Sequence, residues 1–365
     1  MDNISHPFLP STTPDPNYQS PMKNHFSTAF SALILSLVFL LGVPGNLFIV
    51  WSILARTRRR SVTTLLILNL ACADAFLMAL TIFIIIYLVM KTWIFGNTMC
   101  KILFYLVNSN MYASVFLITL MSVHRLVAVV FPHTLFHLIT RKVVRRVIMG
   151  MWVLVMVMSI PSLVFRNVKE ETDDMNNKRN VCAPHHTLPK HVVFQYAFET
   201  VAGFIIPYAI IIICYVLILK HLRETKFQRK VRSEKLILAV VITFGLFWLP
   251  YHIINMMQVA AKWCPKDLPI RKTLHDISDN SRAVTSSLAL ISSCANPILY
   301  TFAGKSYIRK NGFAFMAKVF EGTYSEQTGI KNSRSTTRDE LGKNKADFTN
   351  HPLASMPQNA DCVHN

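Results

Sequence analysis

Residues 28–54 read TAFSALILSLVFLLGVPGNLFIVWSIL, an apolar run without one charged side chain. A helix of about 20 mostly apolar residues is enough to cross the hydrocarbon core of a bilayer. Within lipid the backbone has no water to bond with, and a helix satisfies its N–H and C=O groups internally. This run is therefore predicted to be a transmembrane helix.

Six further apolar runs of similar length follow along the chain, and the many short alternating segments typical of a membrane β-barrel do not occur. The runs together predict an all-α membrane protein, a seven-transmembrane-helix bundle that occupies residues 28–303. The further runs lie at 63–90, 99–131, 143–165, 192–220, 234–261 and 281–303.

The composition of the chain agrees with this reading. Of the 365 residues, 52% are hydrophobic and 16% are charged, whereas soluble domains carry about 25% charged residues. The formal net charge is +19, but the basic residues lie between the apolar runs rather than across one folded surface. We therefore expect the lipid bilayer as a partner and no nucleic acid. Seven scattered cysteines predict neither a disulfide scaffold nor a zinc site.

The loops predict the orientation of the chain. Those between spans one and two, three and four, and five and six are rich in Lys and Arg, whereas residues 166–190 mix both signs of charge. The positive-inside rule places the basic loops in the cytoplasm and the N-terminal tail, residues 1–27, outside. The sequon Asn3-Ile4-Ser5 then lies on the side where glycosylation occurs. We expect a multi-pass protein of the plasma membrane.

The sequence changes character after the last span. In residues 304–320 the apolar side chains of Ile308, Phe315 and Val319 recur at helical spacing among basic residues. This pattern predicts a short amphipathic eighth helix on the inner leaflet. Residues 321–365 are polar and are expected to form a disordered cytoplasmic tail.

Asp74 lies in the middle of span two, where an ionised side chain costs ~2.5–3.5 kcal/mol on insertion scales. It is either a tolerated acid that faces the bundle interior or part of an ion or switch site, and we favour the second. Oxygen-rich surroundings suit a hard cation such as sodium. We predict sodium, held by Asp74 and Ser114, as an allosteric ion and expect no other cofactor. Further mid-span partners of Asp74 are Asn46, Asn110, Ser292 and Asn296.

Three residues near the span ends raise separate expectations. Arg125 lies at the inner end of span three, where a snorkelling and a functional arginine are equally compatible with the sequence. Cys100 precedes span three and Cys182 lies in the loop between spans four and five. Both cysteines are predicted to lie outside, in an oxidising compartment, so we expect them to form a disulfide.

The motifs along the spans resemble, in order, those of the rhodopsin-like G-protein-coupled receptor family. The resemblance covers about residues 28–320. The motifs are Gly45-Asn46, Asn69-Leu70-Ala71 with Asp74, Trp93-Ile94-Phe95-Gly96 before Cys100, His124-Arg125, Trp152 with Pro161, Pro207 with Tyr215, Phe244 with Phe247-Trp248-Leu249-Pro250, and Asn296-Pro297-Ile298-Leu299-Tyr300.

This resemblance implies roles for the matching residues. Arg125 is expected to meet the G protein, and Trp248 and Phe244 to relay ligand binding to the swing of span six. Tyr215 and Tyr300 are expected to stabilise the open form. Sodium in the inactive form would lie among Asp74, Ser114, Ser292 and Asn296.

One position departs from the family pattern. The family usually has an acid where this chain has His124, and a neutral histidine cannot form the acid–arginine ion pair with Arg125. We hypothesise a weaker lock on the inactive state.

Several stretches resemble the leukotriene B4 receptors within that family, namely 50–54 with 61–63, 109–115, 198–204, 247–252 and 315–323. The resemblance implies a chemoattractant-type receptor for leukotriene B4 or a closely related hydroxy fatty acid. It also implies signalling through heterotrimeric G proteins of the inhibitory class. Arrestin and receptor kinases are expected to act on the tail.

The outer half of the bundle is expected to hold an acidic lipid. Span three has no outer Asp for an amine ligand, and span seven has no Lys for a retinal Schiff base. The lipid carboxylate is predicted to pair with Arg166 or Arg282, unless these arginines snorkel or pair with Glu199. Where the family often has His, this chain has Phe104. The predicted ligand-binding residues are Tyr112, Arg166, Glu199, His252, Asn255 and Arg282.

A receptor for a peptide chemoattractant is the alternative, because an acidic or C-terminal carboxylate can use the same arginines. A transporter would show inverted repeats, and the sequence shows no repeat. No catalytic constellation is recognisable, so we expect that the protein is not an enzyme.

Overall fold

The computed structural model describes residues 25–56, 61–131, 141–172, 178–224, 232–265 and 267–303. The predicted sequon at Asn3, the eighth helix at 304–320 and the tail at 321–365 lie outside these residues.

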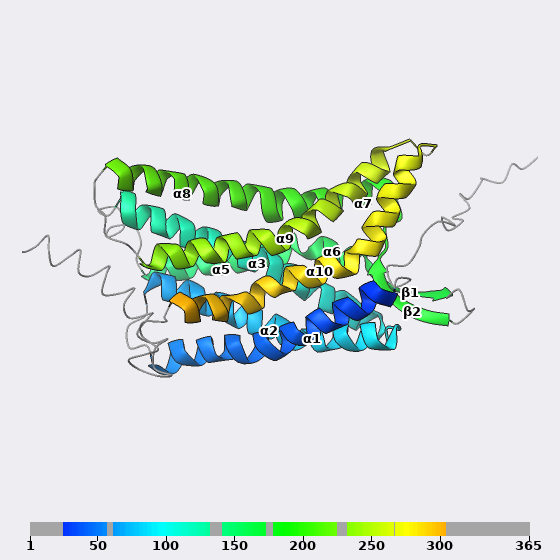
Figure 1. Cartoon of the computed structure of the whole chain (residues 1–365), viewed down its shortest axis with the longest axis horizontal. Helices are drawn as coiled ribbons and strands as arrows, with labels where there is room; N and C mark the ends of the chain where they lie inside the picture. Colours follow the sequence, from blue (N-terminus) through cyan, green and yellow to red (C-terminus); the bar gives the residue numbers. More distant parts are fainter. Residues whose placement is uncertain are drawn as a thin grey trace, which may run out of the picture.

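Long helices arranged side by side form the described part of the chain (Figure 1). The first three spans correspond to α1 (His25–Trp51), α2 (Val62–Met90) and α3 (Gly96–Val130), with a π-helical turn η1 (Ser52–Arg56) after α1. The next two are α5 (Arg141–Met158) with α6 (Ile160–Phe165), and α7 (Pro189–Thr200), η2 (Val201–Ile205) and α8 (Ile206–Glu224). The last two are α9 (Arg232–Trp263) and α10 (Pro269–Ala303).

Six of these spans, within the described ranges, are long and apolar enough to cross a membrane. The seventh, α10, is less apolar because its first half carries charged side chains such as Arg271, Asp279 and Arg282. Its second half packs against α1, α2 and α9, with Ala289, Leu290 and other side chains buried. The helix is held in the bundle by this packing and by its polar contacts rather than by overall apolarity.

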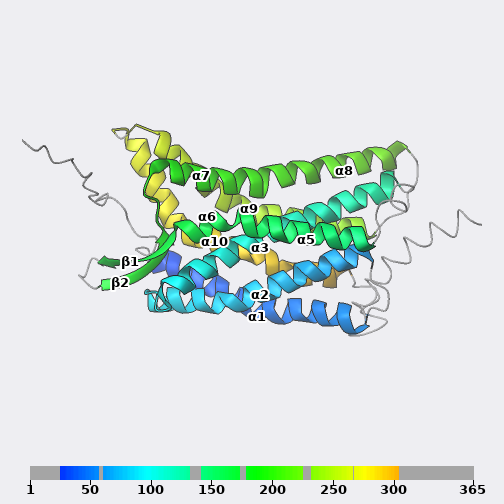
Figure 2. The same ribbon diagram turned by 180° about the vertical axis from the view of Figure 1, so that it is seen from behind.

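The segment between α6 and α7 folds into two antiparallel strands, β1 (Arg166–Thr172) and β2 (Lys178–Pro184), with Val168 opposite Cys182. Figures 1 and 2 place this hairpin at the same end of the bundle as the α9–α10 connection. We call it the hairpin end. The hydropathy pattern did not predict these strands, because the segment has no apolar run.

Two spans are interrupted next to prolines. α5 ends at Met158, and Ser159 precedes α6, which has Pro161 in its first turn. The π-helical turn η2 ends just before Pro207, whose missing N–H cannot complete an α-helical bond. A π-helical turn inserts an extra residue into the helix. The side chains of α7 therefore point in different directions from those that an uninterrupted α-helix continuing α8 would give. Glu199, near the end of α7, is buried in the bundle interior.

The apolar core runs through the middle of the bundle. Leu70, Met111, Ile118 and Trp248 belong to one buried cluster that joins α2, α3 and α9. Close helix contact needs a glycine at Gly45 of α1, where an added Cβ would lie 3.0 Å from the Pro297 ring of α10. The glycine of the Gly45-Asn46 motif therefore allows α1 and α10 to approach each other.

Candidate functional site

Glu199 is the centre of a buried polar cluster near the hairpin end. Its side chain is 2% exposed. Oε1 accepts hydrogen bonds from Asn108 Nδ2 at 3.1 Å and Gln195 Nε2 at 2.9 Å. Oε2 accepts from Tyr251 Oη at 3.0 Å and Asn255 Nδ2 at 3.4 Å. A carboxylate has about four acceptor sites, so neutral donors from α3, α7 and α9 fill the capacity of Glu199.

Arg282 approaches this cluster from α10 without pairing with Glu199. Its Nη1 donates to Asn255 Oδ1 and its Nη2 donates to Gln258 Oε1 at 2.6 Å. Its guanidinium carbon lies 4.8 Å from the ring centre of Tyr196 and 5.5 Å from that of Tyr251. Within the part of the chain that the structure describes, no carboxylate forms an ion pair with Arg282.

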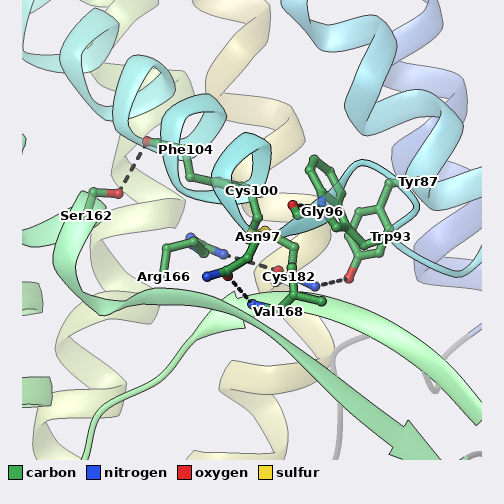
Figure 3. Close-up of a disulfide and its surroundings, with 10 residues drawn as sticks. All are labelled: Tyr87, Trp93, Gly96, Asn97, Cys100, Phe104, Ser162, Arg166, Val168 and Cys182. Atoms are coloured by element: carbon green, nitrogen blue, oxygen red, sulfur yellow. Dashed lines mark hydrogen bonds between the residues drawn. A yellow bond between two sulfur atoms is a disulfide. The ribbon is translucent and has the colours of Figure 1, made fainter.

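Arg166, the second predicted arginine, is the first residue of β1. Its guanidinium carbon is 3.8 Å from the ring centre of Phe104, and Nη1 donates to the Cys182 carbonyl at 3.4 Å (Figure 3). Burial lowers the pKa of the guanidinium, and Tyr196, Tyr251 and Glu199 oppose that shift. Arg166 is thus within electrostatic reach of the Glu199 cluster but, among the described residues, has no carboxylate partner.

The Cys100–Cys182 disulfide is present, which confirms its prediction, and it joins β2 to α3 with a Cα–Cα distance of 5.8 Å. Figure 3 shows the polar contacts beside it: Cys182 N donates to Tyr87 Oη at 3.2 Å, and Val168 N donates to Asn97 Oδ1 at 2.9 Å. The hairpin is therefore attached to α2 and α3 at several points. This attachment holds Arg166 and Cys182 over the end of the bundle.

Deeper in the bundle, next to the Glu199 cluster, lie two of the buried polar atoms that have no hydrogen-bond partner among the described residues. They are Tyr112 Oη and His252 Nε2. His252 uses its other ring nitrogen, Nδ1, with Thr200 Oγ1 at 3.3 Å, and its ring stacks on Phe204 at 4.6 Å. Buried polar atoms are normally satisfied, so these two are suited to a ligand hydroxyl or an ordered water.

Aromatic rings connect this region to the centre of the bundle. The Trp248 ring lies 6.2 Å from His252 and 5.5 Å from Phe244. Trp248 Nε1 donates to Ser292 Oγ at 3.0 Å. The predicted relay residues Phe244 and Trp248 therefore lie between His252, which is predicted to bind the ligand, and Ser292, which is predicted to neighbour Asp74.

Asp74 is fully buried and is bonded from two other helices. Its Oδ2 accepts from Asn296 Nδ2 at 2.8 Å, and its Oδ1 accepts from Asn110 Nδ2 at 3.4 Å. Ser114 Oγ and Asn110 Oδ1 are buried oxygens that have no partner in the described portion of the chain. A carboxylate together with unsatisfied neutral oxygens is a donor set that fits a hard cation.

Two predicted neighbours of Asp74 bond elsewhere. Asn46 donates from Nδ2 to the carbonyls of Gly42 at 3.0 Å and Ser293 at 3.1 Å. Ser292 donates to the Ala289 carbonyl at 2.7 Å and accepts from Trp248. The structure thus joins Asp74 directly to Asn110 and Asn296.

At the opposite end of the bundle, His124 and Arg125 are each 7% exposed. That burial places Arg125 inside the bundle, which disfavours the snorkelling reading, and its functional role stays a prediction. Tyr215 of α8 is partly buried against the core. Tyr300 lies in α10, and its side chain is outside the described residues.

Several members of the Glu199 cluster were not predicted from the sequence. Asn108, Gln195 and Tyr251 bond to Glu199, and Gln258 bonds to Arg282. Helical spacing could have identified some of them, because residues four apart lie on the same face of a helix. Gln195 precedes Glu199 by four residues, and Tyr251 precedes Asn255 by four.

The amino-acid sequence is similar to those of known membrane receptors. The model of the 7 transmembrane receptor (rhodopsin family) matches residues 45–300. Human leukotriene B4 receptor 1 is 36% identical over 310 residues, which cover 85% of this chain and 87% of the relative. Mouse leukotriene B4 receptor 2 is 32% identical, with 85% of each chain covered. The C3a anaphylatoxin chemotactic receptor of Oncorhynchus mykiss is 32% identical, over 83% of this chain and 81% of that receptor.

All three relatives are receptors and none is an enzyme. The family match extends from residue 45 in α1 to residue 300 in α10 and covers well over half of the chain. This protein therefore belongs to the rhodopsin family of seven-transmembrane receptors.

Proposed function

We propose that this receptor binds leukotriene B4 or a closely related hydroxy fatty acid and signals through heterotrimeric G proteins. The observation that carries the proposal is the pair Arg166 and Arg282. Two guanidinium groups lie near one buried polar cluster, and no described carboxylate pairs with either. Such a site is suited to an acidic group supplied by the ligand.

The two arginines differ in how much bonding capacity they retain. A guanidinium has five N–H donors. Arg166 uses one of them, on the Cys182 carbonyl, whereas Arg282 already donates to two amide oxygens. Arg166 is therefore the stronger candidate for a two-point contact with a carboxylate, with Arg282 adding a second positive charge.

The hydroxyl groups of the ligand have candidate partners deeper in the bundle. Tyr112 Oη and His252 Nε2 are buried and unsatisfied in the described structure. Glu199 and Asn255 are already bonded to each other and to neighbouring side chains, so a ligand hydroxyl reaches them only by displacing a donor. Leukotriene B4 carries one carboxylate and two hydroxyls, which matches this division into charged and neutral contacts.

Sodium is proposed as an allosteric ion at Asp74. Asp74 and Ser114 would be its ligands, with Asn110 and Asn296 beside them. Bound there, the cation would supply positive charge to a buried carboxylate and link α2, α3 and α10. The family role proposed for this site is to favour the inactive arrangement.

Transmission through the membrane uses the remaining predicted residues. We propose that the hairpin end faces the outside of the plasma membrane, as the positive-inside rule requires. Ligand binding would act through Trp248 and Phe244, and Arg125 would meet the G protein, with Tyr215 and Tyr300 stabilising the open form. Arrestin and receptor kinases are proposed to act on the tail, and the inhibitory class of G protein is the proposed transducer.

A receptor for a peptide chemoattractant is the second candidate, favoured by the similarity to a C3a anaphylatoxin chemotactic receptor. Expression of the full chain in cells separates the two. Calcium and cyclic-nucleotide responses are measured for leukotriene B4, related hydroxy fatty acids and chemotactic peptides, against untransfected cells. We expect a lipid response that disappears when inhibitory-class G proteins are inactivated. A response to peptide with none to any lipid would replace the first candidate by the second.

A further inference from the structure

A histidine in the loop between β2 and α7 contacts the Glu199 cluster. His186 follows β2, and its Nε2 lies 2.7 Å from Gln195 Oε1. Gln195 Nε2 in turn donates to Glu199 Oε1 at 2.9 Å. Because the amide nitrogen of Gln195 faces the carboxylate, its oxygen must face His186, so His186 must carry a proton on Nε2. The three side chains form one directed chain of hydrogen bonds.

The surroundings of His186 hold this ring in place. Its ring centre lies 5.0 Å from that of Phe165 and 5.7 Å from that of Tyr196. Burial lowers the pKa of His186 to about 4, with Arg166 also lowering it and the Gln195 bond opposing. The imidazole is therefore neutral at physiological pH and donates one N–H bond from Nε2.

The chain of bonds continues beyond Glu199 to α10. Glu199 Oε2 accepts from Asn255 Nδ2, which turns Asn255 Oδ1 toward Arg282. Arg282 Nη1 donates to that oxygen. A continuous donor–acceptor path therefore leads from the loop after β2, through α7 and α9, to the guanidinium on α10.

This arrangement has a consequence for the charge of Arg282. Neutral donors satisfy Glu199, so the carboxylate does not need the arginine as a partner. A guanidinium carries a full positive charge and a neutral donor does not, so Coulomb attraction to the carboxylate is stronger for Arg282. A Glu199 that loses a neutral donor would therefore attract the guanidinium directly. Arg282 would then be neutralised inside the protein and withdrawn from an acidic ligand.

We propose that His186 and Gln195 are positioning residues that keep Glu199 satisfied and thereby leave the Arg282 charge available to an acidic ligand. The acidic lipid in this statement rests on the proposed function. The hydrogen-bonded path from His186 to Arg282 does not depend on the identity of the ligand. Ligand binding and the path are therefore tested separately.

The first test compares leukotriene B4 with its methyl ester on the full-length receptor in cell membranes. His186→Ala and Gln195→Leu are expected to weaken binding of the free acid by roughly tenfold, the equivalent of one net hydrogen bond to a charged group. Binding of the ester, which has no charge for Arg282 to meet, is expected to change less than about twofold under the same reasoning. His186→Gln restores an N–H donor and should recover acid binding.

His185→Ala is the matched control, because the neighbouring His185 has no side-chain hydrogen bond within the described ranges and only its backbone N–H bonds to Phe165. It should leave both affinities unchanged. Equal losses for acid and ester in His186→Ala would indicate general damage to the pocket and overturn the proposal.

The second test needs no ligand. Melting temperatures of the purified full chain are measured for Gln195→Leu, Arg282→Gln and the double variant. In Gln195→Leu the guanidinium of Arg282 is expected to replace the lost donor on Glu199, and in the double variant that replacement is missing. The double variant is therefore predicted to lose more stability than the sum of the single losses. Additive losses, or a loss smaller than the sum, would overturn the proposal, and His186→Ala replaces Gln195→Leu if that variant does not fold. If the wild-type receptor did not bind leukotriene B4, the proposed function would be refuted. The melting temperatures of the two single variants and the double variant would still test the hydrogen-bonded path from His186 to Arg282.

Discussion

Gly203→Ala tests the close packing of the π-helical turn η2 against α3. A Cβ added at Gly203 would lie 2.8 Å from Tyr112 Cε1 and 3.3 Å from Met111 Cε. The Tyr112 ring is fully buried, so it cannot turn into solvent to avoid the new methyl group. Ordinary contacts begin near 3.4 Å, and the ring or the turn must therefore move.

Two opposing effects set the size of the change. Replacing a helical glycine by alanine stabilises by roughly 0.5–1 kcal/mol through chain entropy. Overpacking a well-packed core costs typically about 1–3 kcal/mol. The midpoints of the two ranges predict a net destabilisation of about 1 kcal/mol for Gly203→Ala, and their extremes give about 0–2.5 kcal/mol. Displacement of Tyr112 should also weaken binding of a hydroxylated ligand.

Thermal unfolding of the purified full chain in detergent measures the effect. Gly150→Ala in α5 is the matched control, because nothing lies within 4 Å of a Cβ added there. We expect Gly203→Ala to melt below wild type and Gly150→Ala to melt at or above it. If both variants were equally stable or more stable than wild type, the close contact between η2 and Tyr112 would be refuted.

Four further predictions follow from individual residues. Folding lowers the pKa of His186 from 6.5 to about 4. As the pH falls, the unfolded chain therefore binds a proton at His186 before the folded chain does, and the free energy of unfolding should decrease between about pH 6.5 and 4. His186→Gln should flatten that decrease, which is measured by melting curves at several pH values. Arg166→Gln should raise the Kd for the acidic lipid roughly 10- to 100-fold, given about 1.5–3 kcal/mol for a charged hydrogen bond, while surface expression measured in parallel stays unchanged. Asp74→Asn should abolish any dependence of agonist affinity on sodium, measured by titrating sodium against a constant total ionic strength; sodium dependence that persists would exclude this site. His124→Asp should lower ligand-independent signalling in cells by adding an acid beside Arg125, and unchanged basal signalling would contradict the weaker lock that we hypothesise.

The sequence contained enough information for the helices and for several contacts. Apolar runs such as 28–54 predict spanning helices because lipid leaves the backbone no partner except itself. The Cys100–Cys182 bond followed from the side of the membrane on which each cysteine was expected. Asp74 was identified because an ionised side chain in the middle of a bilayer is energetically unfavourable. In the structure it is hydrogen-bonded to the predicted partners Asn110 and Asn296.

Hydropathy was less informative where polar side chains pack against one another. The first half of α10 carries charges and extends beyond the predicted span at 281–303, because contacts with α9 hold it rather than lipid. The strands β1 and β2 have no apolar pattern of their own, and their position follows from bonds to α2 and α3 and from the disulfide.

The sequence by itself determined that the chain crosses a membrane as a helical bundle, and its motifs indicated the receptor family. Only the tertiary structure decided what Glu199 does. Its donors Asn108, Tyr251 and Asn255 are 91, 52 and 56 residues away along the chain. No local pattern specifies that such distant amides and hydroxyls converge, because their positions follow from the packing of α3, α7 and α9. That convergence satisfies the carboxylate with neutral groups and leaves the Arg282 charge without an acidic partner in the described protein.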